Sequence, residues 1–70
     1  MKRTPVASSN VKSVGFENGT LEVEFANGSV YRYTGPSAEE HHKAMLKAPS
    51  IGSYIAKHVR PDTRLEVRKL

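Results

Sequence analysis

The sequence predicts a small α+β fold, an antiparallel sheet with two short helices packed on one face, in the order β-β-β-α-α-β. Three patterns predict it. Residues 11–33 alternate between apolar and polar side chains around two Asn-Gly pairs, residues 37–59 carry apolar residues at helical spacing, and alternation returns over residues 63–70. We expect a single domain over residues 10–70, after a flexible arm of residues 1–9 that lacks any period.

The first hairpin is predicted around Asn18-Gly19, because Asn-Gly between two alternating runs is the strongest local signal for a two-residue turn. The flanking strands are residues 11–16 and 21–25. The turn brings apolar residues opposite one another: Phe16 opposite Leu21, and Val14 opposite Val23.

The second Asn-Gly pair, at residues 27 and 28, allows two registers. A two-residue turn places Tyr31 and Tyr33 on the outer, glutamate-bearing face of the sheet. A three-residue loop, with Gly28 in the left-handed conformation as a bulge, turns both rings inward. The bulged register pairs Val23 with Tyr31, Leu21 with Tyr33, and Glu22 with Arg32. We expect this register, because the alternative would bury the Arg32 charge.

Two helices are predicted next. Ser37 and Glu40 have the spacing of a capping box, and the helix is expected to run to about Lys47, before Pro49. Its inner stripe is thin: Ala38, His41 or His42, and Met45, with Leu46 adjacent. The second helix is expected to begin at Ser50 and end at Arg60-Pro61-Asp62, with a stripe of Ile51, Tyr54, Ile55, His58 and Val59. The last strand would turn Leu65 and Val67 inward and Arg64, Glu66 and Arg68 outward.

An ordered set of short elements over about residues 6–60 resembles the KTSC domain. The elements are Val6-Ala7-Ser8-Ser9-Asn10-Val11, Ser13-Val14-Gly15-Phe16, Leu21 to Gly28, Tyr31-Arg32-Tyr33 and Ala48 to Tyr54. The family hallmark, Tyr-x-Tyr, falls here on Tyr31 and Tyr33, and its A-x-S-x-G element on Ala48, Ser50 and Gly52. Two departures are Phe16, where a tyrosine is usual, and Gly35-Pro36 in place of an apolar residue before the proline. The resemblance implies bacterial or phage origin and a link to some lysyl-tRNA synthetases, which carry this domain at the C-terminus.

Catalytic, metal and cofactor chemistry are not predicted. The chain has no cysteine, and adjacent histidines such as His41 and His42 point about 100° apart on a helix, which suits no shared metal. His58 is expected to pack or to cap a helix end. Ser8-Ser9 lacks a nucleophile elbow and a base at fixed spacing, so we expect no enzyme. No apolar run approaches the roughly 20 residues of a membrane span, and no apolar stretch follows the basic start, so we expect a cytoplasmic protein without membrane association.

The charge pattern predicts a binding function. The net charge is +4, and both ends of the chain are basic while residues 17–40 hold five glutamates against one arginine. The leading hypothesis is a non-enzymatic module that binds nucleic acid, RNA in particular, through a basic C-terminal segment. Its candidate contacts are Lys57, Arg60, Arg64, Arg68 and Lys69. The alternative is a protein-interaction or structural accessory domain, and the oligomeric state stays open between monomer and weak homodimer. At Ser50 and Gly52, close packing is favoured over phosphate binding.

Overall fold

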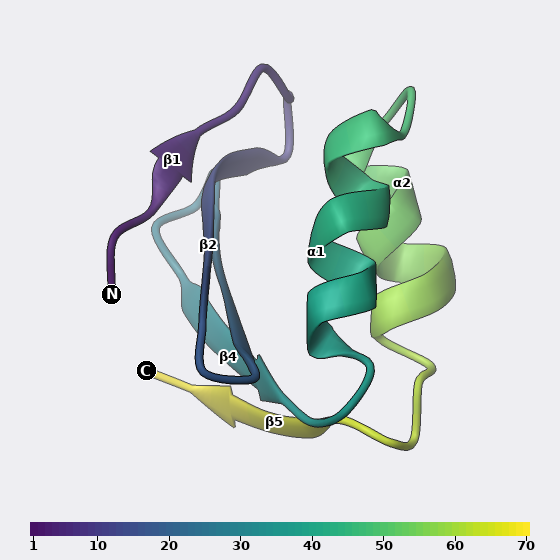
Figure 1. The fold of residues 1–70 in the computed structure, drawn as a ribbon. Helices are drawn as coiled ribbons and strands as arrows, with labels where there is room; N and C mark the ends of the chain where they lie inside the picture. The colour runs from purple at the N-terminus through teal and green to yellow at the C-terminus, as the bar shows by residue number, and fades with distance from the viewer.

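The computed structural model describes residues 1–70 and has two layers, a five-stranded antiparallel sheet and a pair of helices on one of its faces (Figure 1). The strands lie side by side in chain order: β1 (Thr4–Pro5), β2 (Val11–Glu17), β3 (Thr20–Phe25), β4 (Val30–Thr34) and β5 (Glu66–Lys69). The helical layer consists of α1 (Ala38–Lys47) and α2 (Ile51–Tyr54), which continues into a π-helical turn, η1 (Ile55–Val59). The predicted fold class and the order of the three predicted strands, the helices and the final strand are confirmed.

The first strand lies in the segment that was expected to be a loose arm. Thr4 pairs with Val14 and Pro5 pairs with Ser13, so β1 adds an edge to β2. The backbone at Lys2 passes close to Gly15: a Cβ atom on Gly15 would lie 2.6 Å from the Lys2 carbonyl oxygen. The missing side chain at Gly15 is therefore what lets the N-terminal segment lie against β2.

The first hairpin has the predicted two-residue turn. Asn18 and Gly19 both have positive φ, at 48° and 76°, as a type I′ turn requires. The predicted pairs, Phe16 with Leu21 and Val14 with Val23, are present.

The second hairpin has the bulged register, which confirms that prediction. Gly28 has a φ of 91°, and its N–H donates to the Phe25 carbonyl at 2.9 Å, while the Phe25 N–H donates to the Ser29 carbonyl at 2.8 Å. Three residues therefore separate the paired ends of the hairpin. The resulting pairs are the predicted ones: Val23 with Tyr31, Leu21 with Tyr33, and Glu22 with Arg32. Tyr31 and Tyr33 consequently lie on the face of the sheet that carries the helices.

Helix α1 has the predicted bounds, and His41 rather than His42 is the buried histidine, but the capping box is wrong. Ser37 occupies the N-cap position with helical backbone angles (φ −93°, ψ −3°) instead of the extended angles that direct a capping side chain back to the helix. Its hydroxyl donates instead to the Asp62 carboxylate at 2.7 Å. Glu40 is exposed and makes no hydrogen bond to Ser37.

The second helix begins as predicted, because the Ser50 hydroxyl accepts a hydrogen bond from the Ser53 N–H at 3.2 Å. Its last turn widens, and the Arg60 N–H donates to the Ile55 carbonyl five residues earlier. The wider turn rotates later side chains around the helix axis. Ile55 and Val59 remain buried, but His58 is exposed, so its expected place in the inner stripe is wrong.

The last strand is shorter than predicted and only Leu65 of its apolar pair is buried. Val67 pairs with Tyr33 and shares its face, yet 52% of Val67 is exposed. Helix α1 packs on β2 and β3, so the helical layer does not extend over the edge strand β5. The buried apolar core lies between these layers and consists of Val11, Val14, Leu21, Val23, Tyr33, Ala38, Met45, Ile55, Val59 and Leu65. None of the helices is long and apolar enough to cross a membrane.

Candidate nucleic-acid interface

A groove lies on the helix-bearing face of the sheet, where the helical layer stops short of β4 and β5. Its volume is about 530 Å³. Aromatic and apolar side chains line it together with polar ones, chiefly Phe25, Tyr31, Tyr33, Val67, Arg60 and Asn27. This combination of rings, a cation and an amide in one open groove is suited to a flat, polar-edged ligand with negative charge.

Three aromatic rings form a row along the groove. Phe25 meets Tyr31 edge to face, with ring centroids 5.6 Å apart and an interplanar angle of 82°. Tyr31 and Tyr33 lie nearly parallel, with centroids 6.4 Å apart. Tyr33 is 4% exposed and belongs to the core, whereas Tyr31 is only half-buried. Tyr31 is therefore the ring of the Tyr-x-Tyr pair that a ligand in the groove can stack against.

Two cations border the rings. The Lys69 ammonium lies 6.0 Å from the centroid of the Tyr31 ring, and Arg60 lines the groove from the end of η1. Burial raises the pKa of the Tyr33 phenol, and the charge of Arg60 offsets only part of that effect. The Tyr33 hydroxyl thus stays protonated at neutral pH and remains a hydrogen-bond donor.

The structure gathers at the groove only two of the five basic residues that the sequence singled out, Arg60 and Lys69. Arg64 is bound to the Asp62 carboxylate through Nε at 3.0 Å and Nη2 at 3.1 Å. Arg68 pairs with Arg32 across β4 and β5, and so lies on the opposite face of the sheet. Lys57 is exposed on η1.

The remaining residues singled out by the sequence are Gly52, in α2, and Ser50, at the N-cap of that helix. A Cβ atom on Gly52 would lie 3.3 Å from the Asn10 side chain, which is the close packing that was favoured over phosphate binding. The Ser50 hydroxyl is occupied by its capping bond. Phe25, Asn10 and Asn27 also line the groove, and they are not among the site residues predicted from the sequence. Phe25 has the pattern of any inward strand residue, and the two asparagines carry no signal beyond that of turns and loops.

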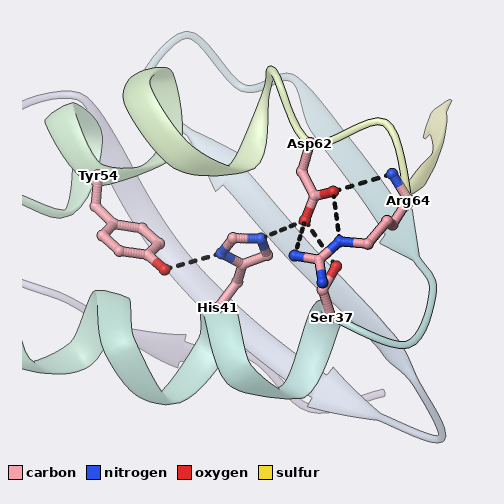
Figure 2. Close-up of polar contacts among 5 residues, drawn as sticks. All are labelled: Ser37, His41, Tyr54, Asp62 and Arg64. Carbon is pink, nitrogen blue, oxygen red and sulfur yellow. Dashed lines mark hydrogen bonds and ion pairs between the residues drawn. The ribbon is translucent and has the colours of Figure 1, made fainter.

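A polar network centred on Asp62 lies between the two helices and the loop before β5 (Figure 2). Asp62 Oδ2 is 2.7 Å from both His41 Nε2 and the Ser37 hydroxyl, and Arg64 binds both carboxylate oxygens. His41 Nδ1 is 2.8 Å from the Tyr54 hydroxyl. Figure 2 shows these side chains converging from α1, α2 and the loop before β5, so the network joins three segments that are distant in the sequence.

The proton positions in this network follow from its acceptors. An ionised carboxylate only accepts, so His41 Nε2 carries a proton and donates to Asp62. With the ring proton on Nε2, Nδ1 can accept a hydrogen bond from the Tyr54 O–H. Burial, with Glu40 and Asp62 adding to it, raises the pKa of Tyr54, which keeps the phenol protonated in this role. The chain of Asp62, His41 and Tyr54 is therefore fully satisfied and acts as a clip between the helices and the loop before β5.

We expect the stability of the fold to fall at acid pH, because the clip depends on an ionised Asp62. Hydrogen bonds from Arg64, then His41 and Ser37, hold the pKa of Asp62 well below its ordinary value of 3.8. A carboxyl group with a lowered folded-state pKa stabilises the fold above its unfolded-state pKa, and this stability is lost as the pH falls below about 4. Urea midpoints measured from pH 7 to pH 3 should therefore fall steeply in the wild type and less in Asp62→Asn. Equal slopes for the two proteins would contradict the assignment. Glu39→Gln serves as the control, because Glu39 is an exposed carboxylate whose ion pair with Lys43 lies on the surface of α1, and its slope should equal that of the wild type.

The outer face of the sheet holds a second buried carboxylate. Glu22 is 4% exposed and is bound by Arg32 Nε at 2.7 Å and Arg3 Nη1 at 2.8 Å. Burial alone would raise the pKa of Glu22, but the hydrogen bonds and charges of Arg32 and Arg3 outweigh it and hold the pKa below 4.5. Arg3 thereby ties the N-terminal segment to the centre of the sheet. The chain nowhere groups three or more His, Cys, Asp or Glu side chains in a way that could hold a metal ion.

These features define a small α+β domain: a five-stranded antiparallel sheet that carries two helices and an aromatic groove on the same face. The chain belongs to the KTSC domain family, whose model matches residues 7–62. The predicted resemblance is thereby confirmed.

Two relatives support this membership. An uncharacterized protein of Stutzerimonas stutzeri (strain A1501) is 38% identical over 64 residues, which cover 89% of this chain and 89% of that protein. The crystal structure of a KTSC domain protein from Yersinia pestis has a TM-score of 0.83 at 30% identity, and the match covers 99% of this chain and 96% of that one. The match to the crystal structure covers 99% of this chain, so β1 and β5 both lie within the region of structural similarity.

Proposed function

We propose that this protein is a non-enzymatic binding module for single-stranded nucleic acid, RNA in particular, and that the groove is its binding surface. The observation that carries the proposal is the half-buried Tyr31 ring with the Lys69 ammonium 6.0 Å from its centroid. A ring of this kind can stack against any base, since every base has a π-face. Lys69 and Arg60 would then neutralise the phosphates on either side of the stacked base.

Two further features support this proposal. The net charge of +4 and a pI of about 9.7 favour a polyanionic ligand over a neutral one. The Asn27 amide, which also accepts from the Ser29 N–H at 3.0 Å, lines the groove and still has its N–H donors for a base edge. The link between KTSC domains and some lysyl-tRNA synthetases favours RNA over DNA, by analogy.

The proposal predicts a definite salt dependence. Titration of a labelled single-stranded RNA at several salt concentrations should give an affinity that falls as salt rises, because each phosphate contact releases a counterion. With contacts from Arg60 and Lys69 alone, the slope of log K against log salt is expected near −1.4, since each contact to a single strand contributes about −0.7. Arg60→Ala should reduce the slope by one contact.

Arg68→Ala is the matched control, because it removes the same charge from the opposite face of the sheet. Its slope should equal that of the wild type. An absence of binding at low salt would refute the proposed function, and an equal loss in Arg60→Ala and Arg68→Ala would place binding outside the groove.

A further inference from the structure

The two edges of the sheet differ in whether they can accept another strand. At one edge, β1 is two residues long and includes Pro5, which has no N–H to donate. At the other edge, β5 is a regular four-residue strand whose residues are all exposed. The β5 edge is therefore the side at which this sheet can be extended.

The outward backbone groups of β5 can be identified from its pairing. The Leu70 N–H donates to the Val30 carbonyl of the hairpin at 2.8 Å, so the backbone groups of Leu70 point toward β4. Backbone groups alternate in direction along an antiparallel strand. Those of Arg68 and Glu66 consequently point toward β4 as well, while those of Val67 and Lys69 point outward and have no partner strand.

The side chains of β5 are complementary to a second copy of the same strand. An antiparallel pair centred on Val67 brings Val67 against its own copy and Glu66 against Arg68 of the partner subunit. The central valine pair forms two reciprocal hydrogen bonds, which is the geometry that the outward groups of Val67 require. The pair also covers a valine that is 52% exposed in the monomer.

Arg68 provides a second, independent observation. It lies directly opposite Arg32, and like charges at such a position destabilise a sheet. Arg32 is neutralised by Glu22, but Arg68 makes no ion pair within the chain. A partner strand in this register supplies the missing counter-charge on the same face, because it places the partner's Glu66 beside Arg68.

We propose that β5 is a self-association edge, at which two copies of the chain join their five-stranded sheets about a two-fold axis at Val67. Val67 also lines the groove, so the axis brings the two grooves of the dimer next to each other on one face. The strand is short and each copy carries a charge of +4, so the dimer is weak.

Sedimentation velocity of the full chain over a range of concentrations tests this proposal, in the absence of any nucleic acid. The wild type should show a reversible monomer–dimer equilibrium that shifts toward dimer at higher protein concentration. Glu66→Arg sets two cations against each other at both ends of the central pair and should weaken the dimer by about tenfold. The double variant Glu66→Arg with Arg68→Glu reverses both charges and should restore the wild-type dissociation constant.

The outcomes separate cleanly. Rescue by the double variant supports the proposed register, whereas a wild type that stays monomeric at millimolar concentration overturns the proposal. A dimer that both variants leave unchanged also overturns it, because association then uses another surface. Because no nucleic acid is present, each result is independent of whether the groove binds RNA.

Discussion

Replacing His41 with alanine is expected to destabilise the fold by about 2–4 kcal/mol, the largest stability effect of any histidine substitution in this chain. His41 is 8% exposed, and both of its ring nitrogens are hydrogen-bonded, to Tyr54 and to Asp62. The substitution removes a ring from the core and leaves the Tyr54 hydroxyl without a buried partner. Thermal unfolding should show a melting temperature lower by at least about 8 °C, at about 4–8 °C per kcal/mol for so small a domain.

His58→Ala is the matched control, because His58 is exposed and only packs its ring against Tyr54 at a centroid distance of 4.7 Å. Its melting temperature should change by a few degrees at most. A similar loss for the two variants would show that the clip around Asp62 does not hold the helices. Tyr54→Phe should fall between them, with a loss of about 1 kcal/mol for one hydrogen bond.

Replacing Tyr31 with alanine is expected to weaken binding of single-stranded RNA by about tenfold to a hundredfold, the range for loss of one stacked base. Tyr31 is half-buried at the groove, whereas Tyr33 belongs to the core, and the Lys69 ammonium lies over the Tyr31 ring. Fluorescence anisotropy with a labelled oligonucleotide measures the effect. The thermal stability of the variant should be measured in parallel, since Tyr31 also packs against the core.

Tyr31→Phe provides the control for this experiment. It keeps the ring and removes only the hydroxyl, so it should bind RNA within about threefold of the wild type if stacking carries the affinity. If Tyr31→Phe loses as much affinity as Tyr31→Ala, the hydroxyl rather than the ring makes the contact. Unchanged binding in Tyr31→Ala would remove the groove from the binding surface.

The strand registers were predictable because they are decided locally. At the second hairpin, one register pairs Glu22 with Arg32 and the tyrosines with Val23 and Leu21, and the other mismatches all of them. Cross-strand complementarity and a glycine suited to positive φ therefore agree, and Gly28 has the expected conformation.

Two of the wrong structural predictions, for Ser37 and for the N-terminal segment, involve contacts between residues that are distant in the chain. The sequence predicts a local capping box at Ser37, but the Ser37 hydroxyl donates to Asp62, 25 residues later. Likewise, β1 pairs with β2 through backbone groups, and its sequence lacks the alternation of apolar and polar residues that would predict a strand. Local patterns cannot reveal such contacts, because the competing partner arrives only when the chain is folded.

The tyrosine pair shows how far the sequence could lead toward the candidate site. The bulged register predicted from the sequence is correct, so both tyrosine rings lie on the helix-bearing face of the sheet. The sheet, however, is wider than the helical layer, so Tyr33 is buried and Tyr31 borders an open groove. The relative widths of two layers depend on packing across the whole domain, which strand alternation does not encode.

The central claim is that single-stranded RNA binds in the groove beside Tyr31. Intermolecular nuclear Overhauser effects between base protons of a short unstructured RNA and side-chain protons of the protein test it most directly. We expect contacts from the bases to the rings of Tyr31 and Phe25. Contacts that arise only at Arg3, Arg32 and Arg68, on the opposite face of the sheet, would contradict it.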